Sequence, residues 1–162
     1  MAVYERISLR SARKDESAAL SELCLRSKAI WGYDRDFLET CRDELSVGEA
    51  AIKAGLVTVA ETGSNVVGTA ELSFEDGIAY LEKLFVDPGI LRCGAGRMLF
   101  DRVRQMATEL GAHELVIEAD PDAVPFYMAM GCESSGTAPS GSIPGRVLPR
   151  LVCTLSGQKR QS

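Results

Sequence analysis

The segment LFVDPGILRCGAGRMLFDRV, residues 84–103, constrains the fold most, because its pattern changes from strand-like to helix-like within a few residues. An apolar run stops at Pro88, Gly94 and Gly96 follow, and apolar residues then recur at helical spacing. A helix N-terminus exposes unpaired N–H groups, and glycines let a backbone approach a phosphate closely. The segment therefore predicts a strand, a glycine loop and a helix, which form either a phosphate site or a plain packing turn.

Two common nucleotide motifs do not fit the spacing of this loop. A P-loop requires G-x-x-x-x-G-K-[ST], and no such run occurs in the chain. A dinucleotide fingerprint requires a third glycine where Leu99 stands. A hairpin meander, and not a first βα unit, precedes the loop. The phosphate of some other ligand remains open, as does a packing turn.

The other patterns predict an α/β chain, of the α+β type, with a mixed sheet and helices on its faces. Asp15 is the expected cap of the first helix. The segment 134–145, rich in Ser, Gly and Pro, is expected to be a loop. The expected elements are, in order, a strand at 7–9, helices at 16–28 and 37–45, a three-strand meander at 56–61, 66–74 and 78–86, a helix ending at Gly111, a strand at 114–119, a short helix ending at Gly131 and a strand at 147–155.

Composition narrows the class of protein. We expect a single domain over 1–162, with a core over about 5–155 and a polar tail at 156–162. The net charge of −5 argues against nucleic-acid and anionic-membrane binding. Five cysteines without a CxxC spacing favour reduced thiols in a cytoplasmic protein without a metal site. The N-terminus has no signal-peptide pattern, and no apolar run is long enough for a membrane span.

Two motifs resemble those of the GNAT N-acetyltransferase family. The segment LEKLFVDPGILRCGAGRMLFDRV is similar to the family's acetyl-CoA-binding segment, a strand with a Val-x-Pro end, then [Arg/Gln]-x-x-Gly-x-[Gly/Ala], then a helix. Downstream, DPDAVPFYMAMGCE is similar to Asn-x-x-Ala-x-x-[Phe/Leu]-Tyr-x-x-x-Gly-Phe. The chain departs from these motifs at Leu91, which replaces Arg or Gln, at Cys132, which replaces an aromatic residue, and at Asp120 or Asp122, which replaces the Asn.

The resemblance implies the GNAT fold, a mostly antiparallel central sheet flanked by helices, and acetyl-CoA as co-substrate. The glycine loop would then hold the coenzyme A pyrophosphate, and the preceding strand would pair with the pantetheine. The cofactor residues implied in this way are Leu84, Phe85, Val86, Arg92, Cys93, Gly94, Ala95, Gly96, Arg97, Asp120, Asp122 and Tyr127.

Acetyl transfer to an amine needs a base and an acid. Glu82 is the first candidate base, acting directly or through a water, because it lies on a strand expected to be covered by apolar neighbours, which would raise its pKa. A surface ion pair is the structural alternative, and Glu118 is the competing base. Tyr127 is the candidate acid that protonates the thiolate, although it could be only a core aromatic residue. His113 is expected in a surface loop, and Cys93, which has no adjacent base, is disfavoured as an acyl acceptor.

Two segments could face the acceptor. Trp31 and Tyr33, with acidic neighbours, would suit a cationic amine. Arg146 would suit a substrate carboxylate. The first expectation is therefore direct acetyl transfer from acetyl-CoA to a primary amine of a small molecule. The alternatives are acetylation of a protein or peptide amine, and a non-catalytic coenzyme A sensor. A homodimer is possible within the resemblance.

Overall fold

The computed structural model describes residues 6–30, 32–90, 94–141 and 143–155. Its strands form one seven-stranded sheet in the order β1-β2-β3-β4-β5-β7-β6. The pair β4–β5 is parallel, and β1–β2, β2–β3, β5–β7 and β6–β7 are antiparallel. This mixed sheet with helices confirms the expected fold class.

The elements are β1 (Ile7–Ser11), η1 (Lys14–Glu16), α1 (Ser17–Ala29), α2 (Arg35–Leu45), α3 (Glu49–Lys53), β2 (Val57–Thr62), β3 (Asn65–Glu75), β4 (Ile78–Val86), η2 (Pro88–Ile90), α4 (Ala95–Glu109), β5 (Glu114–Glu118), η3 (Pro121–Ala123), α5 (Val124–Ala129), β6 (Glu133–Pro139) and β7 (Val147–Thr154).

The chain divides into two compact units. The first unit comprises Met1–Glu71 and Lys83–Asp101, and the second comprises Leu72–Glu82 and Arg102–Ser162. Each unit is described below by itself.

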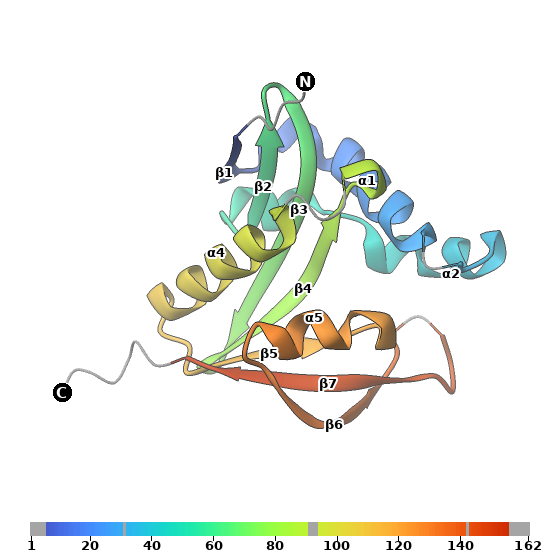
Figure 1. Cartoon of the computed structure of the whole chain (residues 1–162), viewed down its shortest axis with the longest axis vertical. Helices are drawn as coiled ribbons and strands as arrows, with labels where there is room; N and C mark the ends of the chain where they lie inside the picture. Colours follow the sequence, from blue (N-terminus) through green and yellow to red (C-terminus); the bar gives the residue numbers. More distant parts are fainter. Residues whose placement is uncertain (1–5, 31, 91–93, 142, 156–162) are drawn as a thin grey trace. The chain divides into compact units, whose positions relative to one another are not determined.

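In the first unit, β1 and β2 pair from Ile7 with Thr62 to Ser11 with Thr58. Helices α1 and α2 pack against each other, as Figure 1 shows in blue and cyan. The side chain of Asp34 caps α2 by accepting a hydrogen bond of 2.8 Å from the Phe37 N–H. Leu20, Leu23 and Cys24 are buried on α1.

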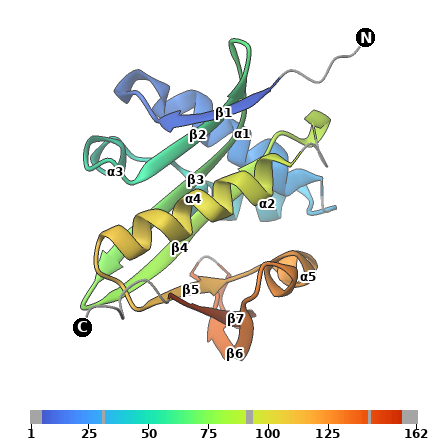
Figure 2. The same cartoon turned by 60° about the vertical axis from the view of Figure 1, so that its left-hand side comes forward.

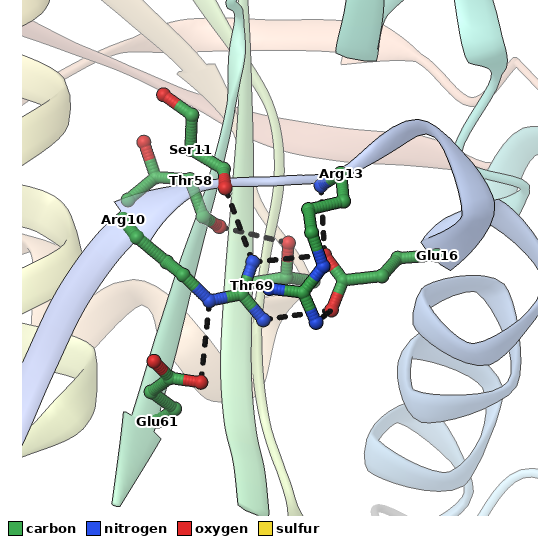
Figure 3. Close-up of polar contacts among 7 residues, drawn as sticks. All are labelled: Arg10, Ser11, Arg13, Glu16, Thr58, Glu61 and Thr69. Carbon is green, nitrogen blue, oxygen red and sulfur yellow. Dashed lines mark hydrogen bonds and ion pairs between the residues drawn. The ribbon is translucent and has the colours of Figure 1, made fainter. Parts of the chain in front are cut away.

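A charged cluster fixes the start of α1 (Figure 3). The Arg10 guanidinium donates to both Glu16 oxygens, at 2.9 and 2.7 Å, and its Nε lies 3.2 Å from Glu61 in an ion pair. The Arg13 N–H donates to Glu16 Oε1 at 2.8 Å. The expected cap at Asp15 is wrong, because a short 3-10 turn precedes α1 and places Glu16 before the helix.

Gly68 on β3 lets other parts of the first unit approach closely. A Cβ at this position would lie 3.0 Å from Leu99 Cδ1 and 3.1 Å from the Phe85 carbonyl oxygen. The Asp87 N–H also donates to the Val67 carbonyl at 2.7 Å. The close packing at Gly68 therefore fixes the end of β4 and the first turns of α4 on the same part of β3.

In the second unit, β4 pairs with β5 from Ile78 with Glu114 to Leu81 with Ile117. Strands β5, β7 and β6 lie side by side, which can be followed in both Figure 1 and Figure 2. The three central residues of β5, Leu115, Val116 and Ile117, are buried, as is Leu151 on β7.

The expectation of a loop over 134–145 is wrong for its first part, which belongs to strand β6. Residues 133–139 pair with β7, although all but one of them are exposed. The register shifts between Ser134 and Thr137, where Gly136 has φ +85°. An exposed edge strand needs no apolar alternation, so its sequence of small polar residues does not show the period that predicts a strand.

Candidate functional site

The glycine loop leads into α4 through a residue in the left-handed region. The Met98 N–H donates to the Gly94 carbonyl at 3.1 Å, so Gly94 is the N-cap of α4. Its φ is +92°, it is exposed, and a Cβ there would meet nothing within 4 Å. The N–H groups of Ala95, Gly96 and Arg97 have no acceptor within the helix, because they lie in its first turn. This N-terminus can therefore bind an anion. Arg92 and Cys93, predicted for the same loop, lie outside the described residues.

The strand that precedes the loop ends beside β3. Leu84, Phe85 and Val86 are each partly exposed at the end of β4. Within the described residues, the register of β4 with β5 ends at Leu81 and Ile117, whereas β4 continues to Val86. This length of strand is available for a ligand that pairs with backbone groups.

Asp87, which the sequence analysis did not single out, shapes the turn after β4. Its Oδ1 accepts a hydrogen bond of 2.9 Å from the Gly89 N–H, and its Oδ2 accepts one of 3.2 Å from Arg26 on α1. The contact with Arg26 joins residues 61 positions apart. The sequence Asp87-Pro88-Gly89 is a turn signal that could have identified this role, but the partner on α1 has no local signal.

Tyr127 lies on α5, whose C-terminus has the hydrogen bonds of a Schellman motif. The Cys132 N–H donates to the Tyr127 carbonyl at 3.0 Å, and the Gly131 N–H donates to the Met128 carbonyl at 3.0 Å. Gly131 has φ +98°, as this motif requires. The Tyr127 side chain is buried and meets the Phe126 ring edge-on, with centroids 5.1 Å apart. Burial is the largest cause that raises the Tyr127 pKa, and the neighbouring Cys132 and Asp120 raise it further.

The structure brings together two residues that were predicted for different roles. Arg146, a candidate for the acceptor, lies 3.4 Å from Asp120 Oδ1, a candidate for the cofactor. Asp120 also lies close enough to Tyr127 to raise the pKa of its phenol. Asp122, in contrast, is exposed in η3. The second unit therefore groups Asp120, Tyr127 and Arg146, and leaves Asp122 at the surface.

Glu82 is exposed on β4, and its carboxylate accepts a hydrogen bond of 2.6 Å from the Ser73 hydroxyl. The expectation that apolar neighbours cover it is wrong. The reason is the alternation of β4, which places Lys83, and not Glu82, on the buried side of the strand. Glu118, the competing base, is also exposed at the end of β5. His113 is exposed in the bend before β5, as expected for a surface residue.

On the acceptor side, Tyr33 stacks on Phe37 with ring centroids 4.2 Å apart and an interplanar angle of 9°. The Lys28 ammonium lies over both rings, at 5.2 and 5.8 Å from their centroids. Lys28 is buried on α1, so this aromatic pair already holds a cation of the protein itself. Trp31 lies outside the described residues.

Neither the described helices nor the described side chains point to a membrane span or a metal site. No helix in the described part of the chain is both long and apolar enough to cross a membrane. Among the described residues, no cluster of His, Cys, Asp and Glu could hold a metal ion.

The mixed sheet and the glycine N-terminus of α4 are features of an acetyltransferase that uses coenzyme A, and the comparisons agree. The family model described as an acetyltransferase (GNAT) domain matches residues 21–139, so the chain belongs to the GNAT acetyltransferase family. The peptidyl-lysine N-acetyltransferase YjaB of Escherichia coli K12 is 32% identical over 133 residues, which cover 80% of this chain and 84% of that protein.

Solved structures share the fold at lower identity. The PaiA N-acetyltransferase of Thermoplasma acidophilum, in complex with coenzyme A, matches with a TM-score of 0.75 and 17% identity, over 92% of this chain and 99% of that one. YncA, a putative acetyltransferase of Salmonella typhimurium with acetyl-CoA, matches with a TM-score of 0.69 and 20% identity, over 93% and 94%. The resemblance identified from the two motifs is confirmed, and the chain is an acyltransferase of the GNAT type.

Proposed function

We propose that the chain transfers the acetyl group of acetyl-CoA directly to a primary amine, and that α4 binds the pyrophosphate through its N-terminus. The left-handed, unobstructed Gly94 at the N-cap of α4 carries this proposal. A side chain there would be strained, whereas glycine leaves the first-turn N–H groups open to an anion. Arg97, exposed in the same turn, adds positive charge. Arg92 and Cys93 complete the proposed loop from sequence alone.

The pantetheine would lie along the end of β4, paired with the backbone of Leu84, Phe85 and Val86. The support for this position is that strand β4 itself continues beyond its last described pair with β5. Main-chain pairing of an extended ligand with a strand edge gives affinity without requiring particular side chains. Asp120 and Asp122 remain proposed cofactor contacts. The side chain of Asp120 is the more restricted in its orientation, because it forms an ion pair with Arg146.

The acid in this proposal is Tyr127. The departing thiolate needs a proton, and thiols have a pKa of about 8.5. Burial raises the pKa of the Tyr127 phenol, so the phenol keeps its proton throughout the neutral range. The phenol is a weaker acid than the thiol that the transfer forms, so it can protonate the departing thiolate only where the two are in contact, and its role is one of position as much as of acidity.

The base in this proposal is Glu82, acting through a water. A lysine-like amine has a pKa of about 10.4 and must lose a proton before it attacks. Glu82 is exposed, so a water can reach it, and the Ser73 hydroxyl orients its carboxylate. Glu118 on β5 is the competing candidate and is also exposed. The matched variants Glu82→Gln and Glu118→Gln separate the two, because the loss of the base lowers kcat about 100-fold.

Two classes of acceptor have support. A small-molecule amine is our first proposal, with Arg146 as the group that would bind a substrate carboxylate in exchange for Asp120. A lysine side chain of a protein is the second, because YjaB, the relative at 32% identity, is named a peptidyl-lysine N-acetyltransferase. The two classes differ in the groups flanking the amine, so one panel of acceptors distinguishes them.

The test measures free-thiol release from acetyl-CoA with polyamines, amino acids, aminoglycosides and lysine-containing peptides, and coenzyme A binding by calorimetry. We expect release with one class of amine. Tight binding of coenzyme A without release with any amine would instead favour the sensor alternative. Absence of coenzyme A binding would overturn the role proposed for Gly94 and the α4 N-terminus.

A further inference from the structure

Cys132 and Cys153 face each other across two paired strands of the second unit. Glu133 at the start of β6 pairs with Val152 of β7, and one step along the antiparallel register brings Cys132 opposite Cys153. Each of the two side chains is the largest influence on the pKa of the other, so the thiols lie in each other's immediate surroundings. Residues directly opposite on antiparallel strands have Cβ atoms about 4.5–5.5 Å apart, and the lower end of that range meets the upper end of the roughly 3.5–4.5 Å found across a disulfide. Both cysteines are free in this structure.

Arg104 of α4 makes this pair different from the other described cysteines. Its Nη1 lies 3.7 Å from Cys153 Sγ and donates to the Met130 carbonyl at 2.9 Å. The hydrogen bond from Cys132 and the guanidinium of Arg104 lower the pKa of the Cys153 thiol, while Cys132 keeps its proton. Burial raises the pKa of Cys24 to about 12, so that thiol is inert by comparison.

We propose that Cys132 and Cys153 form a reversible disulfide when the protein meets hydrogen peroxide, with Cys153 as the attacking thiolate and Cys132 as the resolving thiol. Each cysteine is only 3% exposed, so a small peroxide is the appropriate oxidant. The geometry supplies both requirements of such a pair, a thiol beside a cation and a second thiol opposite it on the neighbouring strand.

Hydrogen peroxide supplies the two-electron oxidant that balances formation of the disulfide. The Cys153 thiolate attacks one peroxide oxygen, the O–O bond breaks, and hydroxide leaves to give a sulfenic acid. The Cys132 sulfur loses its proton to that hydroxide and attacks the sulfenic sulfur, which releases a second hydroxide. The two sulfurs together lose two electrons, the peroxide gains them, and the two thiol protons end in two water molecules. A dithiol reductant reverses the oxidation by exchange.

This disulfide would act on the proposed acid. The Cys132 N–H is the donor that closes the Schellman motif on the Tyr127 carbonyl, so a covalent bond at Cys132 constrains the C-terminus of α5. We expect peroxide to lower acetyl transfer and a reductant to restore it. This consequence rests on the proposed function of Tyr127, whereas formation of the disulfide does not.

Mass spectrometry tests the disulfide independently of activity. After peroxide treatment, the intact protein should lose two hydrogen atoms, and trypsin should release residues 105–146 linked to residues 151–159. The variant Cys132→Ser should instead accumulate a sulfenic acid on Cys153, which dimedone captures. Cys41→Ser, which removes another buried thiol, should leave the linkage unchanged. Absence of the linked peptide at peroxide concentrations that leave the fold intact would overturn the proposal.

The role of Arg104 is tested separately, by comparing the rate of disulfide formation among variants of α4. Arg104→Gln should slow disulfide formation about 10-fold, because fewer Cys153 thiols are ionised at neutral pH. Arg104→Lys should retain most of the rate, and Arg102→Gln, an exposed neighbour on α4, should retain all of it. Circular dichroism checks that each variant is folded. Equal rates for folded Arg104→Gln and wild type would overturn the assignment of the cation.

Discussion

Gly68 on β3 lies so close to Phe85 on β4 that a methyl group could not be added without displacing backbone. A Cβ at Gly68 would be 3.1 Å from the Phe85 carbonyl oxygen and 3.0 Å from Leu99 Cδ1. The Leu99 methyl can rotate away, but the carbonyl belongs to the strand that leads into the glycine loop. Gly68 therefore supports the proposed coenzyme site without touching it.

We predict that Gly68→Ala lowers the free energy of unfolding by about 1–3 kcal/mol, because overpacking forces the backbone at Phe85 to shift. Urea unfolding measures the change. Gly48→Ala is the matched control, since a Cβ at Gly48 would meet nothing within 4 Å and its φ of −83° suits alanine. Equal unfolding midpoints for the two variants would show that the contact at Gly68 is relieved at no cost.

The cluster of Arg10 and Glu16 predicts a pH dependence of stability. The Arg10 hydrogen bonds lower the pKa of Glu16 from 4.5 to about 2. Because the folded pKa is depressed, the stabilisation is present above the unfolded value and is lost as pH falls from about 4.5 to about 2. Its size is on the order of 2–3 kcal/mol. Urea unfolding from pH 6 to pH 2 should show a shallower decline in Glu16→Gln than in wild type.

Asp15→Asn is the control for this pH series. Asp15 is the exposed neighbour that sequence alone favoured as the helix cap, whereas Glu16 is the residue at the N-cap position of α1. Its replacement should leave both the stability and its pH profile within about 0.5 kcal/mol of wild type. A loss at Asp15 equal to that at Glu16 would contradict the assignment of the helix start.

We predict that Gly94→Ala weakens coenzyme A binding about fivefold or more, because a side chain at φ +92° costs about 1–2 kcal/mol and shifts the first-turn N–H groups. Calorimetry measures the affinity. Gly111→Ala is the matched control, with φ +94° and equally open surroundings at the opposite end of α4. It should lose stability by a similar amount and keep its affinity for coenzyme A. Unchanged affinity in Gly94→Ala would argue against pyrophosphate at this loop.

We predict that Tyr127→Phe lowers kcat about 100-fold and changes KM little, because the hydroxyl acts on the leaving thiolate and not on substrate binding. Steady-state thiol release measures both constants. Since burial raises the Tyr127 pKa, the wild-type rate should show no loss from ionisation of this phenol up to about pH 10. A wild-type alkaline limb near pH 8 that disappears in Tyr127→Phe would contradict the raised pKa.

The sequence predicted the elements whose periodicity is strong, and it predicted the glycine loop. The meander, the helix ends at Gly111 and Gly131, and the order of the elements through α5, apart from α3 and the short 3-10 turns, follow from apolar spacing and turn residues. Strand β6 has no such spacing, because its exposed side chains are under no requirement to alternate. The five-residue helix α3 was missed for a related reason, since a single turn has too few residues to show a period.

Contacts between distant residues account for the remaining differences at the candidate site. The hydroxyl of Ser73 on Glu82, the pairing of Arg146 with Asp120 and the guanidinium of Arg104 beside Cys153 all join residues that no local pattern connects. Strand alternation correctly separated Glu82 from Lys83, but it could not say which of the two faces is covered. That choice depends on tertiary packing.

Strand β6 also bears on how copies of this chain could associate. It is the terminal strand in the sheet order, and unprotected terminal strands tend to recruit a strand from another molecule. Here the register shift at Gly136 twists the backbone, and Pro139 removes an amide donor. This edge is therefore poorly suited to continuing the sheet into a second copy. A homodimer of this protein, if one forms, should use side chains on another surface and leave β6 free of intermolecular backbone pairing.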